Sequence, residues 1–213
     1  LILGSAQFGM AYGVTNLDGQ VTSNEVSRIL DSALLGGVRR IDTAMGYGTA
    51  SSVLAELNHG RFSFITKYSA GHTGSWSIDD LSQKLLQTKA LLGKESLRTL
   101  LAHDPLELAG GDGHKNLNLF RGLRESGEIA QIGVSIYDPE DLEEIRNWKV
   151  LDVVQAPLNL FDQRLVRSGW LERLNEAGVE VHTRSSFLQG VLLTKPERLP
   201  DRVSFLRDSL TIL

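Results

Sequence analysis

Short apolar runs alternate with amphipathic segments along almost the whole chain. Seven runs have the length and composition of buried strands, at residues 1–4, 38–42, 62–67, 97–102, 129–135, 153–155 and 179–183. Between them, apolar residues recur every three or four positions, which predicts helices at residues 22–35, 51–58, 78–92, 117–123 and 165–177, and a partial helix at 203–213. Strands that alternate with helices at intervals of about 20 to 35 residues indicate βαβ units and a parallel sheet.

Residues that start or stop helices support several of these boundaries. Thr22 and Glu25 form a capping box before the first long helix, and the pair Gly36-Gly37 ends it. Residues 109–113 are rich in glycine and are predicted to form a loop. The dipeptide Asp138-Pro139 predicts another helix, with an aspartate N-cap and proline at the first helical position.

A parallel sheet of this kind either closes into a barrel or stays open as a doubly wound sheet. A doubly wound dinucleotide-binding sheet carries a G-x-G-x-x-G turn directly after a strand. Gly110, Gly111 and Gly113 are the nearest approach, but they lie far from any predicted strand end, and a Walker A loop is also missing. No internal repeat, low-complexity tract or Pro/Ser-rich linker divides the chain, so we predict one domain over residues 1–213.

Three consecutive predicted strands end on ionisable residues. Asp42, Lys67 and His103 each directly follow a mostly apolar run. In a parallel barrel all strands open on one face, where the active site is assembled from several strand ends. A single charged residue at a strand end is usually a solvated terminus, but three in succession favour a shared site. The pattern therefore favours a (β/α)8 TIM-type barrel.

Tyr47 lies five residues after Asp42, between Gly46 and Gly48, which suits a tight loop over the mouth of the barrel. Taken alone, such a tyrosine is more often a packing residue. The pKa of a free phenol is about 10, and a neighbouring ammonium group such as Lys67 would lower it. Asp42 would then position Lys67, and His103 would donate a hydrogen bond to a substrate oxygen. These four residues make a candidate proton-delivery site.

These residues together resemble the aldo-keto reductase family. Residues 3–9 are similar to that family's first strand, and residues 41–48 to its Asp-Thr-Ala-x-x-Tyr-Gly signature. Lys67 and His103 fall where the family's catalytic tetrad would be completed, and the resemblance extends to about residue 193. It implies that a nicotinamide cofactor passes hydride to a carbonyl carbon while Tyr47 protonates the oxygen, or that the reverse alcohol oxidation occurs.

Later segments resemble the cofactor-binding side of the family. Ser135 and Gln155 stand where family members hold the nicotinamide carboxamide, and residues 184–190 resemble a loop that borders the nicotinamide and the pyrophosphate. The resemblance implies NADP(H), with NAD(H) as the alternative. The cofactor-binding residues that it implies are Ser5, Asp42, Ser135, Gln155, Arg184, Ser185, Phe187, Gln189 and Gly190.

The chain departs from the family pattern at three positions that bear on the site. Ile136 stands where many members carry Asn, which removes one expected carboxamide contact. Arg184 stands where many have a Tyr stacked on the nicotinamide, and a planar guanidinium can stack in its place. Ala6 replaces a bulkier residue that often lines the substrate pocket.

Composition narrows the classes of partner. The 213 residues are 41% hydrophobic, carry a net charge of −4 and contain no cysteine, which excludes disulfides and thiolate chemistry. No basic stripe, long apolar run or metal-ligand spacing is present. We therefore expect a cytoplasmic enzyme, monomeric or a small homo-oligomer, that acts on a small carbonyl compound and binds no nucleic acid, membrane or metal.

Seven strands are one short of the closed barrel. An open seven-stranded barrel would leave two strand edges unpaired, so we expect the natural chain to continue for one more βα unit. In the resembled family that unit recognises the adenosine phosphate, and the choice between NADP and NAD is not readable without it.

Two other functions remain open at this point. Lys67 at a strand end could form a Schiff base with a carbonyl substrate, as in aldolases of that type, although this would leave Tyr47 and His103 without a role. The barrel could also bind nucleotide as a sensor without useful turnover.

Overall fold

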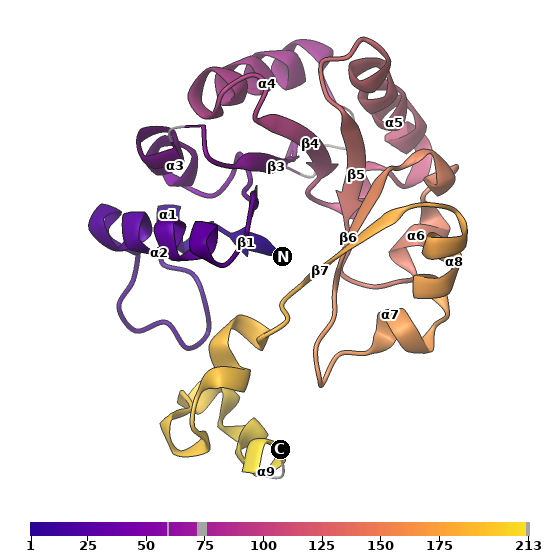
Figure 1. The fold of residues 1–213 in the computed structure, drawn as a ribbon. Helices are drawn as coiled ribbons and strands as arrows, with labels where there is room; N and C mark the ends of the chain where they lie inside the picture. Colours follow the sequence, from indigo (N-terminus) through magenta and orange to yellow (C-terminus); the bar gives the residue numbers. More distant parts are fainter. Residues whose placement is uncertain (59, 72–75, 212–213) are drawn as a thin grey trace.

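Seven strands form one sheet in the computed structural model, which describes residues 1–58, 60–71 and 76–211. All neighbouring strands are parallel and follow chain order. The strands are β1 (Ile2–Gly4), β2 (Arg40–Asp42), β3 (Ser63–Tyr68), β4 (Leu97–Ala102), β5 (Gln131–Ser135), β6 (Val153–Pro157) and β7 (Glu180–Arg184). The sheet curls around a central axis (Figure 1). Chain order without reversal is the topology of a (β/α) barrel, so the predicted fold class is confirmed, with seven strands in the described residues.

Helices follow the strands and cover the outside of the curled sheet (Figure 1). They are α1 (Ala6–Gly9), α2 (Ser23–Leu35), α3 (Ala50–Asn58), α4 (Ile78–Leu92), α5 (Gly110–Glu125), α6 (Asp141–Glu144), α7 (Arg164–Arg167) and α8 (Trp170–Glu176). The predicted capping of α2 is present, because the Thr22 side chain accepts a hydrogen bond from the Glu25 N–H. No helix in the described residues is long and apolar enough to cross a bilayer.

The glycine-rich segment predicted as a loop is instead the first turn of α5, which begins at Gly110. A Cβ atom on Gly113 would lie 2.1 Å from the carbonyl oxygen of Leu108, so only glycine lets this turn pack against the preceding backbone. Close packing therefore outweighs the low helix propensity of glycine, on which the prediction relied.

Two other helix predictions are corrected. The predicted helix at residues 165–177 is divided into α7 and α8 at Gly169, whose φ of 77° is left-handed. The helix expected at Asp138-Pro139 begins only at Asp141, because the Asp141 carboxylate accepts hydrogen bonds from the N–H groups of Tyr137 and Asp138 and holds them in a turn.

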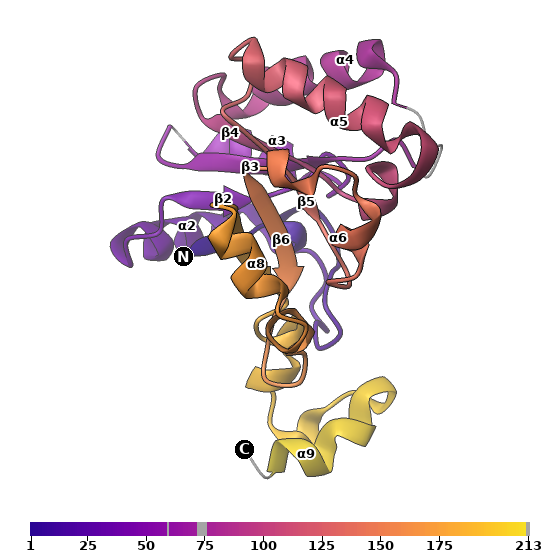
Figure 2. The same cartoon turned by 90° about the vertical axis from the view of Figure 1, so that its right-hand side faces the viewer.

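The chain after β7 contains short turns in place of one long helix. Three 3₁₀ segments (Leu188–Leu193, Pro196–Arg198 and Asp201–Leu206) lead into α9 (Arg207–Thr211), and this segment projects from the barrel (Figure 2). The last two residues of the helix predicted at 203–213 lie outside the described residues.

The interior of the barrel is arranged in layers. Successive side chains of a strand point to opposite faces, so residues two apart share the interior. At the amino-terminal end, Arg40 and Glu180 form an ion pair at 2.8 Å across the barrel. Above them Ile65, Leu101 and Val153 form a small apolar cluster. The next inward positions along the same strands are at the carboxyl ends, where the ionisable residues were predicted.

Candidate active site

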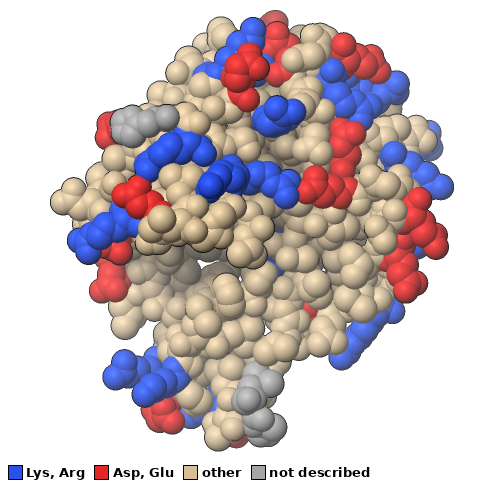
Figure 3. Space-filling model, in the orientation of Figure 1, with Lys and Arg blue, Asp and Glu red and all other residues tan. Residues whose placement is uncertain are grey.

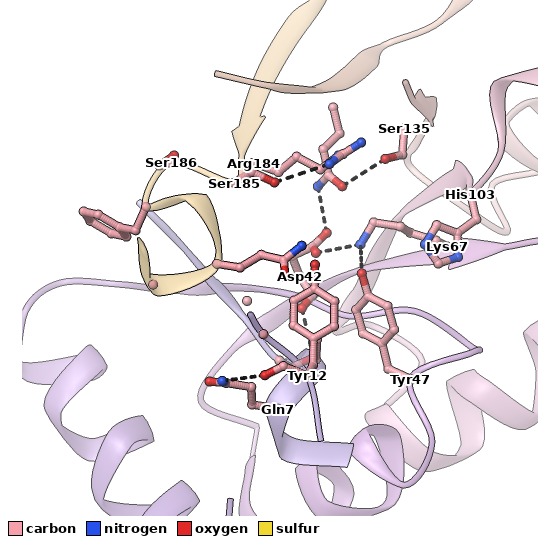
Figure 4. A pocket seen from close by; sticks show the side chains of 18 of the residues that line it. Gln7, Tyr12, Asp42, Tyr47, Lys67, His103, Ser135, Arg184, Ser185 and Ser186 are labelled. Atoms are coloured by element: carbon pink, nitrogen blue, oxygen red, sulfur yellow. Dashed lines mark hydrogen bonds and ion pairs between the residues drawn. The ribbon is translucent and has the colours of Figure 1, made fainter. Parts of the chain in front are cut away.

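A cleft of about 660 Å³ opens at the carboxyl ends of the strands. The strand-end residues that line it come from β2 to β7 or directly follow them, and Figure 4 shows most of their side chains turned into the same space. They are Asp42, Lys67, His103, Ser135, Gln155 and Arg184. The alternation of strand side chains is what brings these six residues, far apart in sequence, to one layer.

Lys67 is the central group of the site. Its side chain is only 1% exposed, and its Nζ donates hydrogen bonds to Asp42 Oδ2 at 2.6 Å and to the carbonyl oxygen of Thr43 at 3.0 Å. Burial lowers the pKa of Lys67, and the Asp42 carboxylate opposes that shift. An ammonium group removed from water needs such partners, so Asp42 holds the charge of Lys67 in place.

Tyr47 lies on the loop between β2 and α3, with its hydroxyl at the same amine. Lys67 Nζ is 3.5 Å from the Tyr47 oxygen, within hydrogen-bonding distance. The rings of Tyr47 and His103 meet edge to face, with centroids 5.8 Å apart. The loop can approach because α1 has a glycine at the contact: a Cβ atom on Gly9 would lie 2.0 Å from the Tyr47 carbonyl oxygen. The four residues predicted to be catalytic therefore lie together.

The expected lowering of the Tyr47 pKa is not found. Burial raises the pKa of this phenol above its ordinary value, and the nearby Asp42 charge raises it further, whereas Arg184 lowers it. Burial is the main reason. In addition, Asp42 compensates the charge of Lys67 at 2.6 Å, so the phenol faces an ion pair and not a lone cation. Tyr47 therefore holds its proton firmly at neutral pH.

His103 is neutral in this setting. Burial lowers the pKa of His103 first, and repulsion from Lys67 lowers it further. A neutral imidazole carries one N–H donor and one acceptor, so it can donate to an oxygen in the cleft without adding charge.

Ser135 and Gln155 form a buried polar pair beside Asp42. The Ser135 hydroxyl donates to Gln155 Oε1 at 3.3 Å, and Gln155 Nε2 donates to Asp42 Oδ1 at 2.9 Å. Both side chains are almost fully buried, yet both line the cleft. An amide and a hydroxyl there retain further donor and acceptor capacity toward a ligand.

Arg184 is the last residue of β7 and lines the cleft. Its Nη2 donates to the Ile136 carbonyl oxygen at 2.9 Å, and its Cζ lies 4.7 Å from the centroid of the Tyr137 ring. Its Nη1 is 3.4 Å from Ser185 Oγ. The guanidinium is thus fixed between a carbonyl group and an aromatic face.

The loop after Arg184 turns sharply along the rim. Ser185, Leu188 and Gln189 all have positive φ, at 57°, 48° and 53°. Ser185, Phe187, Gln189 and Gly190, which the family resemblance implies as cofactor-binding residues, line the cleft. The Gln189 side chain is already engaged, because its Oε1 accepts a hydrogen bond from the Val14 N–H at 3.1 Å.

Ser5 has a positioning contact and lines the same cleft. Its hydroxyl donates to the main-chain oxygen of Asp42 at 2.9 Å, and its backbone N–H donates to the same oxygen at 3.0 Å. The end of β1 is thereby joined to the end of β2 at the residue that holds Lys67.

A model of the aldo/keto reductase family matches residues 1–211. The chain belongs to the aldo/keto reductase family. An aldo-keto reductase from Mycolicibacterium smegmatis is 30% identical over 135 residues, which are 60% of this chain and 45% of the relative. The uncharacterized oxidoreductase YqkF from Bacillus subtilis is 26% identical over 186 residues, 81% of this chain and 59% of the relative. The chain thus spans about half the length of these curated relatives.

Solved structures of aldo-keto reductases share the fold. The enzyme AKR11C1 from Bacillus halodurans, solved in a holo form, matches with a TM-score of 0.67 and 20% identity over 90% of this chain and 63% of that chain. The Bombyx mori enzyme AKR2E4, solved in complex with NADP, matches with a TM-score of 0.63 and 16% identity over 87% of this chain and 62% of that chain.

Two aromatic residues at the cleft were not predicted from the sequence. Tyr12 and Tyr137 both line the cleft and are 43% and 58% exposed. Tyr137 follows Ser135 by two residues, so the rule used for the other strand ends could have found it. Tyr12 belongs to the segment between α1 and α2, where no strand end or periodicity indicates the site. Within the described ranges, no group of three or more His, Cys, Asp or Glu residues could hold a metal ion.

Proposed function

We propose that this aldo/keto reductase chain carries the reaction centre of an NADP(H)-dependent oxidoreductase that reduces an aldehyde or ketone, with Tyr47 as the proton donor. The observation that carries the proposal is the position of Lys67 Nζ, 2.6 Å from Asp42 and 3.5 Å from the Tyr47 hydroxyl, at the floor of an open cleft.

The residues of the cleft fit a nicotinamide group. A carboxamide both donates and accepts hydrogen bonds, and Ser135 and Gln155 offer a buried hydroxyl and amide with capacity to do the same. Arg184, Ser185, Phe187, Gln189 and Gly190 would border the rest of the cofactor along the rim. When bound, the reduced nicotinamide supplies the hydride. The Bombyx mori relative solved with NADP supports NADP(H) as the form used.

The chain's own residues would handle the proton. The raised pKa of Tyr47 keeps its phenol protonated, which is the form that a proton donor needs. Neutral His103 would donate a hydrogen bond that orients the carbonyl oxygen toward Tyr47. As the proton leaves Tyr47, the developing phenolate is stabilised by the ammonium of Lys67, which Asp42 holds in place.

Replacement of Tyr47 by Phe tests the proposal. We expect kcat for a panel of aldehydes and ketones to fall by about 10²- to 10⁴-fold, the usual contribution of a positioned acid, while the Kd for NADPH changes little. Tyr137→Phe is the matched control. It removes a hydroxyl from the same cleft and leaves in place the Tyr47 hydroxyl that contacts Lys67. Full activity in Tyr47→Phe, measured by NADPH absorbance, would end the assignment.

A Schiff base at Lys67 is less well supported. Its amine already donates to Asp42 and Thr43 and contacts Tyr47, so a nucleophilic Lys67 would have to lose these partners. Borohydride trapping of a carbonyl substrate on Lys67, without nicotinamide, would favour that reaction instead.

A further inference from the structure

The charges that line the cleft do not balance. Among the described lining residues the ionic groups are Asp42, Lys67 and Arg184, and the lowered pKa of His103 keeps its imidazole neutral. Asp42 and Lys67 compensate each other at 2.6 Å. No carboxylate in the part of the chain that the structure describes forms an ion pair with Arg184. The charge of Asp162 acts on Arg184 only at longer range, and Asp162 is already ion-paired with Arg164. The lining of the cleft therefore retains one positive charge.

That charge is fixed close to the carboxamide-binding pair. Arg184 donates a hydrogen bond at 2.9 Å to the carbonyl oxygen of Ile136, the residue after Ser135. The N–H of Ile136 in turn donates to the Gln155 carbonyl oxygen at 2.8 Å. The Tyr137 ring supports the guanidinium from one side at 4.7 Å. Figure 4 shows Arg184 and Ser135 facing the same space. A ring held by Ser135 and Gln155 would lie beside this cation.

The two forms of a nicotinamide cofactor differ in the charge of that ring. The oxidised ring carries one positive charge and the reduced ring carries none, whereas the phosphates and riboses are the same in both. A fixed cation in a half-buried cleft repels only the oxidised ring. The field of Arg184 extends through the site, because its charge also lowers the pKa values of Tyr47, Lys67 and His103.

We infer that Arg184 makes this site selective for the reduced form of the nicotinamide cofactor by repelling the oxidised ring. The inference rests on the proposed function and deepens it. Weak binding of the oxidised form means that NADP+ is a poor product inhibitor, so reductive turnover is not slowed by a retained product.

The ratio of two dissociation constants tests the inference without turnover. Isothermal titration calorimetry at low ionic strength gives the Kd for NADP+ and for NADPH in the same buffer. We expect the wild-type protein to bind NADPH more tightly, and Arg184→Gln to reduce the Kd(NADP+)/Kd(NADPH) ratio by about tenfold, the effect of one unit charge several ångströms away in a partly solvated site. Because the phosphates are the same in both forms of the cofactor, contacts to them affect both Kd values equally and leave the Kd(NADP+)/Kd(NADPH) ratio unchanged.

Two variants separate charge from shape and from global effects. Arg184→Lys keeps the charge and should keep most of the wild-type ratio. Arg146→Gln removes the same charge from an exposed position outside the cleft and should leave the ratio unchanged. Circular dichroism of each variant checks that the fold is retained.

Each alternative result has a distinct meaning. Equal ratios in wild type and Arg184→Gln overturn the inference and leave the proposed function intact, and this includes the case in which both Kd values rise together because Arg184 contacts a phosphate. A ratio that falls equally in Arg184→Lys and Arg184→Gln also overturns it, because charge would not be the cause. Failure of the wild-type protein to bind either form would overturn the proposed function and this inference with it.

Discussion

Lys67 keeps a charge where there is almost no water. Its side chain is 1% exposed, and the Asp42 carboxylate at 2.6 Å is the only one that forms an ion pair with it among the described residues. Removal of one member of a buried pair is costly, since the other charge stays buried without compensation. Asp42 therefore has a structural task beside its task in positioning Lys67 for Tyr47.

Asp42→Asn should destabilise the protein in a pH-dependent way. At pH 6 we expect the free energy of unfolding to fall by about 3–5 kcal/mol. Burial already lowers the pKa of Lys67, and loss of Asp42 lowers it further. Between the folded and unfolded pKa values the native state binds fewer protons than the unfolded state, so stability rises with pH. The difference in the free energy of unfolding between wild type and Asp42→Asn should therefore become smaller between pH 6 and pH 9.

Urea unfolding across this pH range measures the effect. Asp31→Asn is the control: it removes the partner of Arg61 in an ion pair whose aspartate side chain is 59% exposed, and should cost no more than about 1 kcal/mol at any pH. A deficit in Asp42→Asn that is small, or that stays constant as the pH rises, would show that Lys67 does not carry a buried charge.

Single residues also show how much of the candidate site could be predicted from the sequence. Asp42, Lys67 and His103 were found because each follows an apolar run, and that rule works whenever parallel strands end on one face. The direction of the Tyr47 pKa was predicted wrongly, because burial and the sharing of the Lys67 charge with Asp42 are properties of three-dimensional packing. Tyr12 was missed because no strand end lies next to it.

At the scale of elements, β5 shows why a glycine is needed inside a strand. A Cβ atom on Gly133 would lie 2.1 Å from the Val153 carbonyl oxygen and 2.7 Å from Leu101 Cδ2. Both atoms belong to neighbouring strands that form the interior of the barrel. Gly133 therefore sets how closely β5 and β6 approach, and hence where Ser135 and Gln155 meet at 3.3 Å.

Gly133→Ala should destabilise the protein, whereas Gly111→Ala should not. The first change forces backbone apart and is expected to cost about 1–3 kcal/mol, the range for overpacking of a core. The second lies on the exposed first turn of α5 with nothing within 4 Å of an added Cβ, and should stabilise by up to about 1 kcal/mol through helix propensity. Thermal and urea unfolding of the two variants give the sign of each change. If both substitutions changed the free energy of unfolding equally, the close approach of β5 and β6 at Gly133 would not be what determines the effect of an added Cβ atom.

Elements were predictable where one local signal dominates. The seven strands lie within about two residues of their predicted bounds, because each apolar run is short and stands out from the amphipathic segments around it. The division between α7 and α8 was not predictable from periodicity, since the apolar pattern continues through Gly169. Likewise the glycines at the start of α5 indicated a loop, because the contact of Gly113 with Leu108 is tertiary.

At the scale of the whole molecule, polar contacts cross the barrel at the end opposite the cleft. Arg40 of β2 pairs with Glu180 of β7 at 2.8 Å, and Glu180 also lies 3.0 Å from His182 Nε2. β2 and β7 are not neighbours in the sheet, so the Arg40–Glu180 ion pair joins strands that no ladder connects. On the face shown in Figure 3, positively and negatively charged side chains are interspersed.

Glu180 should make the stability of the barrel dependent on acid. Burial raises the pKa of Glu180, but the hydrogen bonds from Arg40 and His182 outweigh it and lower the pKa to about 2. A carboxyl whose folded pKa is lowered contributes stability above its unfolded pKa, about 4.3, and loses it as the pH falls toward 2. Because the Glu180 and Arg40 side chains are 39% and 41% exposed, solvent screening reduces the contribution to about 1 kcal/mol.

Glu180→Gln should therefore be less stable than wild type at pH 7 and nearly equal to it at pH 2.5. Arg40→Gln should behave in the same way, and a double-mutant cycle at pH 7 should return a coupling energy of about 1 kcal/mol, because each single change already removes the contact between β2 and β7. Urea unfolding at several pH values provides all of these quantities. A gap between wild type and Glu180→Gln that is as wide at pH 2.5 as at pH 7 would mean that the charge of the Glu180 carboxylate is not the cause of the stability difference. In that case the curl of the sheet would depend on the apolar layer of Ile65, Leu101 and Val153 and not on this ion pair.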